Sequence, residues 1–495
     1  MADAPASKPR SGRHDLTKGP IGRTMLVFAL PVLGTSVVQS LNQSINAIWI
    51  GQLIGERGLT ATANAGQIMF LLLSAVFGVG LAATILVGQA YGRHDLAEAR
   101  RTVGTMASFF AITSILLAAV GYAATDTMLR VMGTPLDAQP FAVAYLRVIF
   151  LALPFIYFNT FLAMALRGSG DSRTPFLFTI LATLFDVGLN PLLIEGWGPF
   201  PRMGIAGSAA ATLVSQTIGL VGLLTYVYAR RFPIRIPLHE IALLIPDRRL
   251  LKASILKGIP MGLQMIVVVV SGISMLGIVN GYGVTTTAAY GVAGQLWVYI
   301  QMPALAVGAA ASSFAAQNIG AKRWDRVERT AGAGILINVA LTGGLILLVY
   351  LVERPLIALF LPHDPAAWPI TMHINAVGLW AYLFLGAGFV LFAVVRATGA
   401  VWPPLIVLTF ALIVVRIPAT LALLPRLGVD AVWWTSPLSM IVALVLAAAY
   451  YRWGGWRRSR MVEAPEVAVA DAGGAPPVEV GASSLASPEA VPARA

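Results

Sequence analysis

The stretch Ala61-Thr-Ala-Asn-Ala65-Gly66-Gln67 returns about 228 residues later as Ala289-Tyr-Gly-Val-Ala293-Gly294-Gln295. In the same register, Gln89-Ala-Tyr-Gly92 returns as Gln317-Asn-Ile-Gly320. A third echo, one residue out of step, matches Arg167, Gly170 and Pro175 to Arg396, Gly399 and Pro404. Because the repeated segments are mostly apolar, the pattern indicates two homologous membrane-embedded halves in tandem. Such halves are typical of secondary transporters, whose substrate site lies between or within the repeats.

The composition excludes a water-soluble globular protein and several kinds of chemistry. Apolar residues make up 57% of the chain and charged residues only 11%, whereas soluble domains carry about 25% charged residues. The chain has no cysteine, which rules out disulfides, thiolate metal sites and cysteine nucleophiles. Its five histidines are scattered without metal-ligand spacing, and no glycine-rich phosphate-binding loop is present. We therefore expect neither an enzyme nor a bound metal or cofactor.

Twelve apolar stretches are long enough to cross a membrane, since a spanning helix needs about 20 residues. They lie near 25–50, 61–87, 103–124, 142–165, 175–195, 204–229, 256–280, 288–316, 331–352, 372–395, 403–424 and 432–451. They are expected to be helices, because lipid offers no hydrogen-bond partner to an open backbone and the period of two of barrel strands is absent. The predicted fold is an all-α polytopic membrane protein with two six-helix lobes. Because six is even, the lobes enter the membrane in the same sense and form a parallel repeat.

Lysine and arginine residues set the expected orientation in the membrane. The chain ends, the loops after even-numbered spans and the central linker carry about four times as many as the opposite side, and Arg167 and Arg396 are counted among the loop residues. Both termini are therefore expected in the cytoplasm, and the net charge of +12 does not indicate nucleic acid. The predicted parts are a tail at 1–20, lobes at 21–230 and 254–455, a linker at 231–253 and a disordered tail at 456–495.

Several motifs in register resemble those of the multidrug and toxic compound extrusion (MATE) transporters, over roughly residues 18–455. The best match is Leu166-Arg-Gly-Ser-Gly-Asp-Ser-Arg-Thr-Pro175, followed by Asn190-Pro-Leu-Leu-Ile194 and Gly204-Ile-Ala-Gly-Ser-Ala-Ala-Ala-Thr212. These look like the family's LRGxGDxxxP, DPLLI and GxxGAAxAT motifs, and Val415-Arg-Ile-Pro418 agrees. The resemblance, to the DinF-like or NorM-like bacterial branch, implies a V-shaped pair of six-helix lobes around a central cavity. It also implies export of drugs or metabolites coupled to an inward flow of H⁺ or Na⁺.

Asp186 is the only acid that the sequence places well inside a span. A carboxylate near the bilayer midplane is costly unless it is protonated, paired or hydrated, so we expect it to couple transport to an ion. The alternative is a structural carboxylate bound to a neighbouring helix. The chain departs here from the family, which usually carries Asn and then Asp four residues apart on span 5, and Asp where span 1 has Asn46. Asp186, Asn190 and Asn46 are thus the predicted ion-coupling residues, with H⁺ favoured over Na⁺.

Other polar residues inside the spans are candidates for the substrate cavity. Gln39, Asn42 and Asn46 recur at i, i+3 and i+7, so they share one face of span 1. The remaining candidates are Tyr145, Asn159, Gln264 and Arg416. The alternative for the uncharged residues is hydrogen bonding between helices, worth about 0.6 kcal/mol each in lipid.

Arg416 lies on span 11, close to the repeat-equivalent position of Asp186. It either pairs or snorkels structurally, or faces the cavity and attracts an anionic group. A direct pair between Asp186 and Arg416, broken on protonation, would make a switch; the sequence leaves these alternatives open.

Pro31 and Pro260 occupy repeat-equivalent positions near the starts of spans 1 and 7. They are predicted hinge or gating residues, because proline removes a backbone hydrogen bond and lets a helix bend. A proline in the first turn or a static kink is the alternative.

These features predict a secondary antiporter of the bacterial inner membrane that exports amphipathic, expected cationic, organic compounds in exchange for H⁺. We expect a monomer whose partners are the small organic substrate, the coupling ion and membrane lipid, with no nucleic acid. The alternative is a flippase of the MOP superfamily that moves a lipid-linked saccharide or precursor. A channel or receptor would not need two pseudo-equivalent lobes.

Overall fold

The computed structural model describes residues 15–360 and 366–462, which are mostly helical and contain no strand. Within these residues, eleven helices are long and apolar enough to cross a membrane, and one bent helix pair supplies a twelfth span. The predicted all-α polytopic fold is confirmed. Most of the two predicted tails, at 1–14 and 463–495, lies outside the described residues.

The first half of the chain forms six long helices, one for each predicted span. They are α1 (Ile21–Leu53), α2 (Glu56–Gly92), α3 (Leu96–Val131), α4 (Gln139–Gly168), α5 (Arg173–Glu195) and α6 (Ile205–Ala229). Several extend beyond the apolar stretch, because polar residues outside the lipid can continue a helix or cap it. Asp95, for example, starts α3 by accepting a hydrogen bond from the Glu98 amide at 2.9 Å.

The second half repeats this plan with interruptions. Its elements are α7 (Arg248–Asn280), α8 (Val284–Gly320), α9 (Trp324–Leu351), α10 (Glu353–Phe360), α11 (Ala367–Gly378), α12 (Ala381–Arg396), α13 (Trp402–Thr409), η2 (Phe410–Val415), α14 (Arg416–Leu427), α15 (Asp430–Trp453) and η3 (Gly455–Arg458). The predicted span at 372–395 is α11 and α12, bent by 41°. The predicted span at 403–424 contains the π-helix η2 directly before Arg416, the kind of insertion that often marks functional positions.

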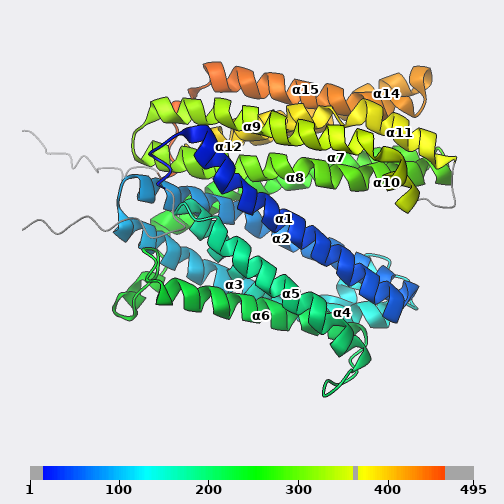
Figure 1. Ribbon diagram of the computed structural model, residues 1–495, viewed down its shortest axis with the longest axis horizontal. Helices are drawn as coiled ribbons and strands as arrows, with labels where there is room; N and C mark the ends of the chain where they lie inside the picture. The colour runs from blue at the N-terminus through cyan, green and yellow to red at the C-terminus, as the bar shows by residue number, and fades with distance from the viewer. Residues whose placement is uncertain (1–14, 361–365, 463–495) are drawn as a thin grey trace, which may run out of the picture. The chain divides into compact units, whose positions relative to one another are not determined.

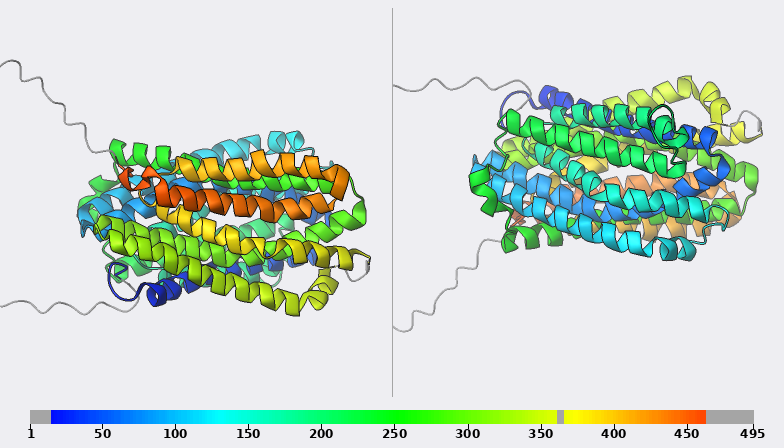
Figure 2. Two further views of the ribbon diagram at one scale, coloured as in Figure 1. Left: turned by 90° about the horizontal axis from the view of Figure 1, so that it is seen from above. Right: turned by 90° about the horizontal axis from the view of Figure 1, so that it is seen from below.

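Figure 1 shows the helices of the first half on one side and those of the second half on the other. The two views in Figure 2 show the long helices running along one common direction, with loops at both ends. The halves meet along α2, which packs on α7 and α8, and along α1, which packs on α5 of its own half and on α8 and α9 of the other. We call the end where α1 begins and α15 finishes, and where the loops at Arg93 and Lys322 lie, the basic end.

The linker between the halves is shorter than predicted. Helix α6 ends at Ala229 and α7 begins at Arg248, so residues 248–253 belong to α7 rather than to the linker. Asp247 starts α7 by accepting hydrogen bonds from the amides of Arg249 and Leu250. Between the two helices lies the short helix η1 (Leu238–Leu244), which packs on α3.

Residues at both predicted tails belong to the folded part. Leu16 is fully buried, its amide donates to Oε1 of Gln317 at 3.3 Å, and its carbonyl accepts from Asn318 at 3.1 Å. At the other end, Trp456 and Met461 are also buried, past the predicted boundary at residue 455. Both segments pack because they present large apolar side chains to the basic end. The average composition of each predicted tail is dominated by its other residues, so it did not indicate these side chains.

Arg326 holds the N-terminal segment in place. It is 8% exposed and donates to the carbonyls of Leu16, Lys18 and Gly19 at 3.0–3.4 Å. Arg326→Ala should therefore lower the free energy of unfolding by about 2 kcal/mol, since the hydrogen bonds from a buried charged donor to these carbonyls are lost. Thermal unfolding of the purified protein in detergent would measure this. The exposed Arg329 on the same helix is the matched control; equal effects of the two alanine substitutions would contradict the role of Arg326.

Candidate functional site: a cavity between the two halves

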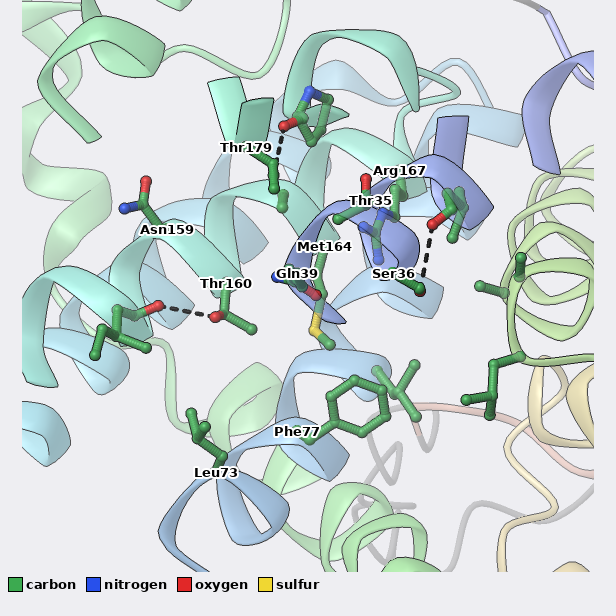
Figure 3. A pocket seen from close by; sticks show the side chains of 18 of the residues that line it. Thr35, Ser36, Gln39, Leu73, Phe77, Asn159, Thr160, Met164, Arg167 and Thr179 are labelled. Carbon is green, nitrogen blue, oxygen red and sulfur yellow. Dashed lines mark hydrogen bonds between the residues drawn. The ribbon is translucent and has the colours of Figure 1, made fainter. Parts of the chain in front are cut away.

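A cavity of about 560 Å³ lies between the halves. Helices α1, α2, α4, α5 and α6 line it from the first half, and α7, α8, α12 and α13 from the second. Figure 3 shows Gln39 of α1 and Asn159 and Arg167 of α4 around the same open space. Most of the lining is apolar, with a few polar and charged side chains between, as in sites for amphipathic ligands.

Asp186 is the centre of a polar cluster on the first-half side of the cavity. It is 2% exposed yet contributes to the lining. Its Oδ2 accepts from Nδ2 of Asn42 at 2.8 Å and from Nδ2 of Asn46 at 2.7 Å. Its Oδ1 accepts from Oγ of Ser215 at 3.3 Å. Three donors from α1 and α6 thus converge on one carboxylate of α5, which suits the ionised form because that form only accepts hydrogen bonds.

Asn190 and Tyr145 lie behind this cluster rather than on the cavity wall. Asn190 is fully buried and donates to Oδ1 of Asn46 at 3.0 Å, which extends the cluster by one helical turn. Tyr145 packs on the first-half core within electrostatic range of Asp186. Neither of these residues, nor Asn46, is among the residues that line the cavity.

The other predicted cavity residues divide between the wall and the core. Gln39, Asn42, Asn159 and Gln264 line the cavity, and Asn159 is also held by the carbonyl and side-chain oxygens of Gln216 at 2.9 Å. Arg416 does not line it; this side chain is 7% exposed in the second half, where Nη1 lies 3.4 Å from Oγ of Ser271. Asp186 and Arg416 make no ion pair in the described part of the chain, so the switch considered from the sequence is absent from this conformation.

Pro31 and Pro260 lie well inside α1 and α7, not in their first turns. The carbonyl of Pro31 accepts from Oγ1 of Thr35, a residue of the cavity wall, at 2.9 Å. Proline leaves the preceding turn of each helix without one backbone hydrogen bond. Their role as hinges stays a prediction.

Two arginines that the sequence assigned to loops instead line the cavity. Arg167 is the last residue but one of α4, and Arg396 is the last residue of α12. Both side chains line the cavity although each arginine stands at a helix end. Their match in the third sequence echo was the signal that could have identified them as a pair.

A pair of repeat-equivalent glutamines joins the two halves at the basic end. Gln89 of α2 donates to the carbonyl of Ala397 at 2.7 Å, and Gln317 of α8 donates to the carbonyl of Gly168 at 2.9 Å. Each bond crosses from one half to the other. At the same end, Leu16, Thr17 and Gly19, which precede α1, make further hydrogen bonds to the second half. We call Gln89, Gln317 and the adjoining Gly92 and Gly320 the glycine–glutamine gate.

Comparison with known proteins gives a consistent result. The MatE family model matches residues 31–192 and again 260–421, once in each half. The chain is 34% identical to the probable multidrug resistance protein YoeA of Bacillus subtilis over 447 residues, which cover 90% of this chain and 96% of that protein. It is 26% identical over 323 residues to the FAD transporter of Shewanella oneidensis, covering 64% of this chain and 69% of that protein.

Among solved structures, an outward-facing MATE transporter of the MOP superfamily has the same fold, with a TM-score of 0.82 at 20% identity. The match covers 90% of this chain and 98% of that one. The family matches confirm the predictions of a transporter rather than an enzyme. With its two matched halves packed around one cavity, this multi-pass membrane protein belongs to the MATE family of multidrug efflux transporters.

Proposed function

We propose that the chain is an antiporter that exports amphipathic organic compounds from the cytoplasm in exchange for protons, and that Asp186 carries the proton. The observation that carries this proposal is a carboxylate that is buried yet borders the cavity. It is the only acid in the cavity lining of the described residues. A proton arriving through the cavity can therefore change the charge of the site at one position.

The hydrogen bonds around Asp186 support H⁺ rather than Na⁺ as the coupling ion. Both carboxylate oxygens already accept from N–H or O–H donors, which a cation needing several oxygen ligands would have to displace. Protonation needs only one new acceptor. Oδ1 of Asn42 is buried without a partner, so rotation of this amide would exchange a donor for an acceptor. Tyr145 of α4 also interacts electrostatically with Asp186.

The cycle follows from charge. With Asp186 ionised, its end of the cavity attracts a cationic group of the substrate; protonation from outside removes that attraction and favours release. Exchange of one proton for one monovalent cation moves no net charge across the membrane, so the pH difference drives it. Each pH unit contributes about 1.4 kcal/mol, which sustains a substrate concentration gradient of roughly tenfold. In this proposal the protein works as a monomer in the bacterial inner membrane, with the basic end in the cytoplasm.

One observation supports the alternative function, that of a flippase for lipid-linked compounds. Arg167 and Arg396 place positive charge in the cavity, as a carrier of lipid-linked phosphates would need. Transfer of a fluorescent lipid-linked phosphate between the leaflets of proteoliposomes would favour this alternative if it needed no proton gradient.

Proteoliposomes loaded with the wild-type protein test the proposal. An ethidium-like cation is added on one side of the vesicle membrane, and the pH inside the vesicles is followed while an H⁺ or a Na⁺ gradient is imposed. We expect substrate-dependent proton flux, and uphill movement of the cation driven by H⁺ alone. Movement driven by Na⁺, or cation movement without proton flux, would reject proton antiport. Flavin nucleotides form a second substrate series, suggested by the name of the Shewanella relative.

A further inference from the structure

The floor of the cavity, at the basic end, carries two guanidinium groups that have no acidic partner among the described residues. Arg396 donates from Nη1 to Oε1 of Gln264 at 2.8 Å, and within the described residues it makes no ion pair. The side chain of Arg167 makes no hydrogen bond to any described residue, and its Nε is buried without a partner. Both side chains line the cavity, where a ligand can reach them. Asp186 is the only acid in the lining of the described residues, so the cavity carries more positive than negative charge.

The opposite charges lie at different heights. Asp186 follows the start of α5 at Arg173 by thirteen residues, which is about 20 Å along the helix. Arg167 precedes that same start and lies at the end of α4. The cavity is thus dipolar, with its negative group well inside the bundle and its positive groups at the floor.

An unpaired guanidinium in a low-dielectric site is costly, and a bound anion relieves that cost. Its planar fork of donors matches the oxygens of phosphate and carboxylate in a bidentate contact. We propose that Arg167 and Arg396 together bind an anionic group, phosphate or carboxylate, of the transported compound. This rests on the proposed function and narrows its substrate class to amphiphiles with an anionic pole, with or without a cationic pole for Asp186.

The two arginines come from different halves, which links this binding to the transport cycle. The residues that follow them, Gly168 and Ala397, accept the two hydrogen bonds of the glycine–glutamine gate. An anion held by both guanidiniums therefore joins the halves just above the closed gate.

Binding of matched flavins tests the proposal without any gradient. Flavin mononucleotide and riboflavin share a fluorescent ring and differ by one phosphate, and each is titrated by fluorescence onto the purified protein in detergent. We expect the wild type to prefer the mononucleotide. Arg167→Gln and Arg396→Gln should each weaken its binding about ten- to a hundred-fold and leave riboflavin binding unchanged. Arg167→Lys should recover part of the loss, and Arg173→Gln, an exposed arginine at the same end of the first half, should have no effect.

Several results would overturn the anion site. Equal wild-type affinity for the two flavins would do so, as would variants that weaken both flavins alike. If neither flavin binds, the experiment is repeated with inorganic pyrophosphate as the ligand, and the rise in unfolding temperature on its addition is measured. If pyrophosphate stabilises the wild type no more than it stabilises Arg167→Gln, the site is rejected. Displacement of the mononucleotide by phosphatidylglycerol would assign the anion to a lipid headgroup and overturn the solute assignment. The binding experiment uses no proton gradient, so a negative result would reject the anion site without bearing on proton antiport.

Discussion

Asp186→Asn is expected to abolish proton-driven efflux while the protein stays folded. Asparagine has the size of aspartate and can keep hydrogen bonds to Asn42 and Asn46, but it takes up no proton and changes no charge. No other acid lines the cavity in the described chain, so none can replace it. The roughly tenfold substrate gradient that one proton sustains per pH unit should then collapse toward equality. Steady-state accumulation of the ethidium-like cation in proteoliposomes with an imposed pH gradient measures this.

Glu195→Gln is the matched control for this variant. Glu195 is the last residue of α5 and makes no contact with the Asp186 cluster, so its substitution should leave the gradient unchanged. Thermal unfolding establishes that Asp186→Asn is folded. A variant that retains the full pH-driven gradient would assign Asp186 a structural role, the alternative that the sequence left open.

The sequence predicted the Asp186 cluster in part because its signals are local. The spacing of Asn42 and Asn46 places them on one face of a helix, and an acid in an apolar span demands polar partners. The structure brings both asparagines to the carboxylate. Ser215 could not be identified in this way, since a serine in a small-residue helix gives no sign of which neighbour it contacts. The break between α11 and α12 and the π-helix before Arg416 also depend on packing that no local pattern encodes.

Arg167 and Arg396 show why a charge count can misplace a residue. Both lie at span ends, where the positive-inside rule counts them with the loops. Whether such a side chain turns to solvent or back into the bundle depends on its direction along the helix, not on its position in the sequence. Their correspondence in the repeat was visible, but only the packed halves show that both face one cavity.

Gly92→Ala is expected to open the basic end. Helices α2 and α8 approach so closely that a methyl group at Gly92 would overlap the backbone carbonyl of Gln317, and one at Gly320 would overlap that of Gln89. Backbone atoms cannot rotate away as a side chain can, so the closed state should lose about 1–3 kcal/mol, which shifts the equilibrium about 5- to 150-fold. Transport should fall, because a cycle needs both ends to close in turn.

Accessibility of one introduced thiol measures this shift, since the chain has no cysteine of its own. Gln39→Cys places the thiol on the cavity wall, and a membrane-impermeant maleimide is applied from either side of the membrane. Adding Gly92→Ala should speed labelling from the basic end. Gly66→Ala, on the same helix with open space around the new methyl, should not. If the two alanine variants label alike from that end, close packing at Gly92 does not hold the basic end shut. Closure of the gate would then have to come from its other contacts, the hydrogen bonds of the two glutamines to Gly168 and Ala397.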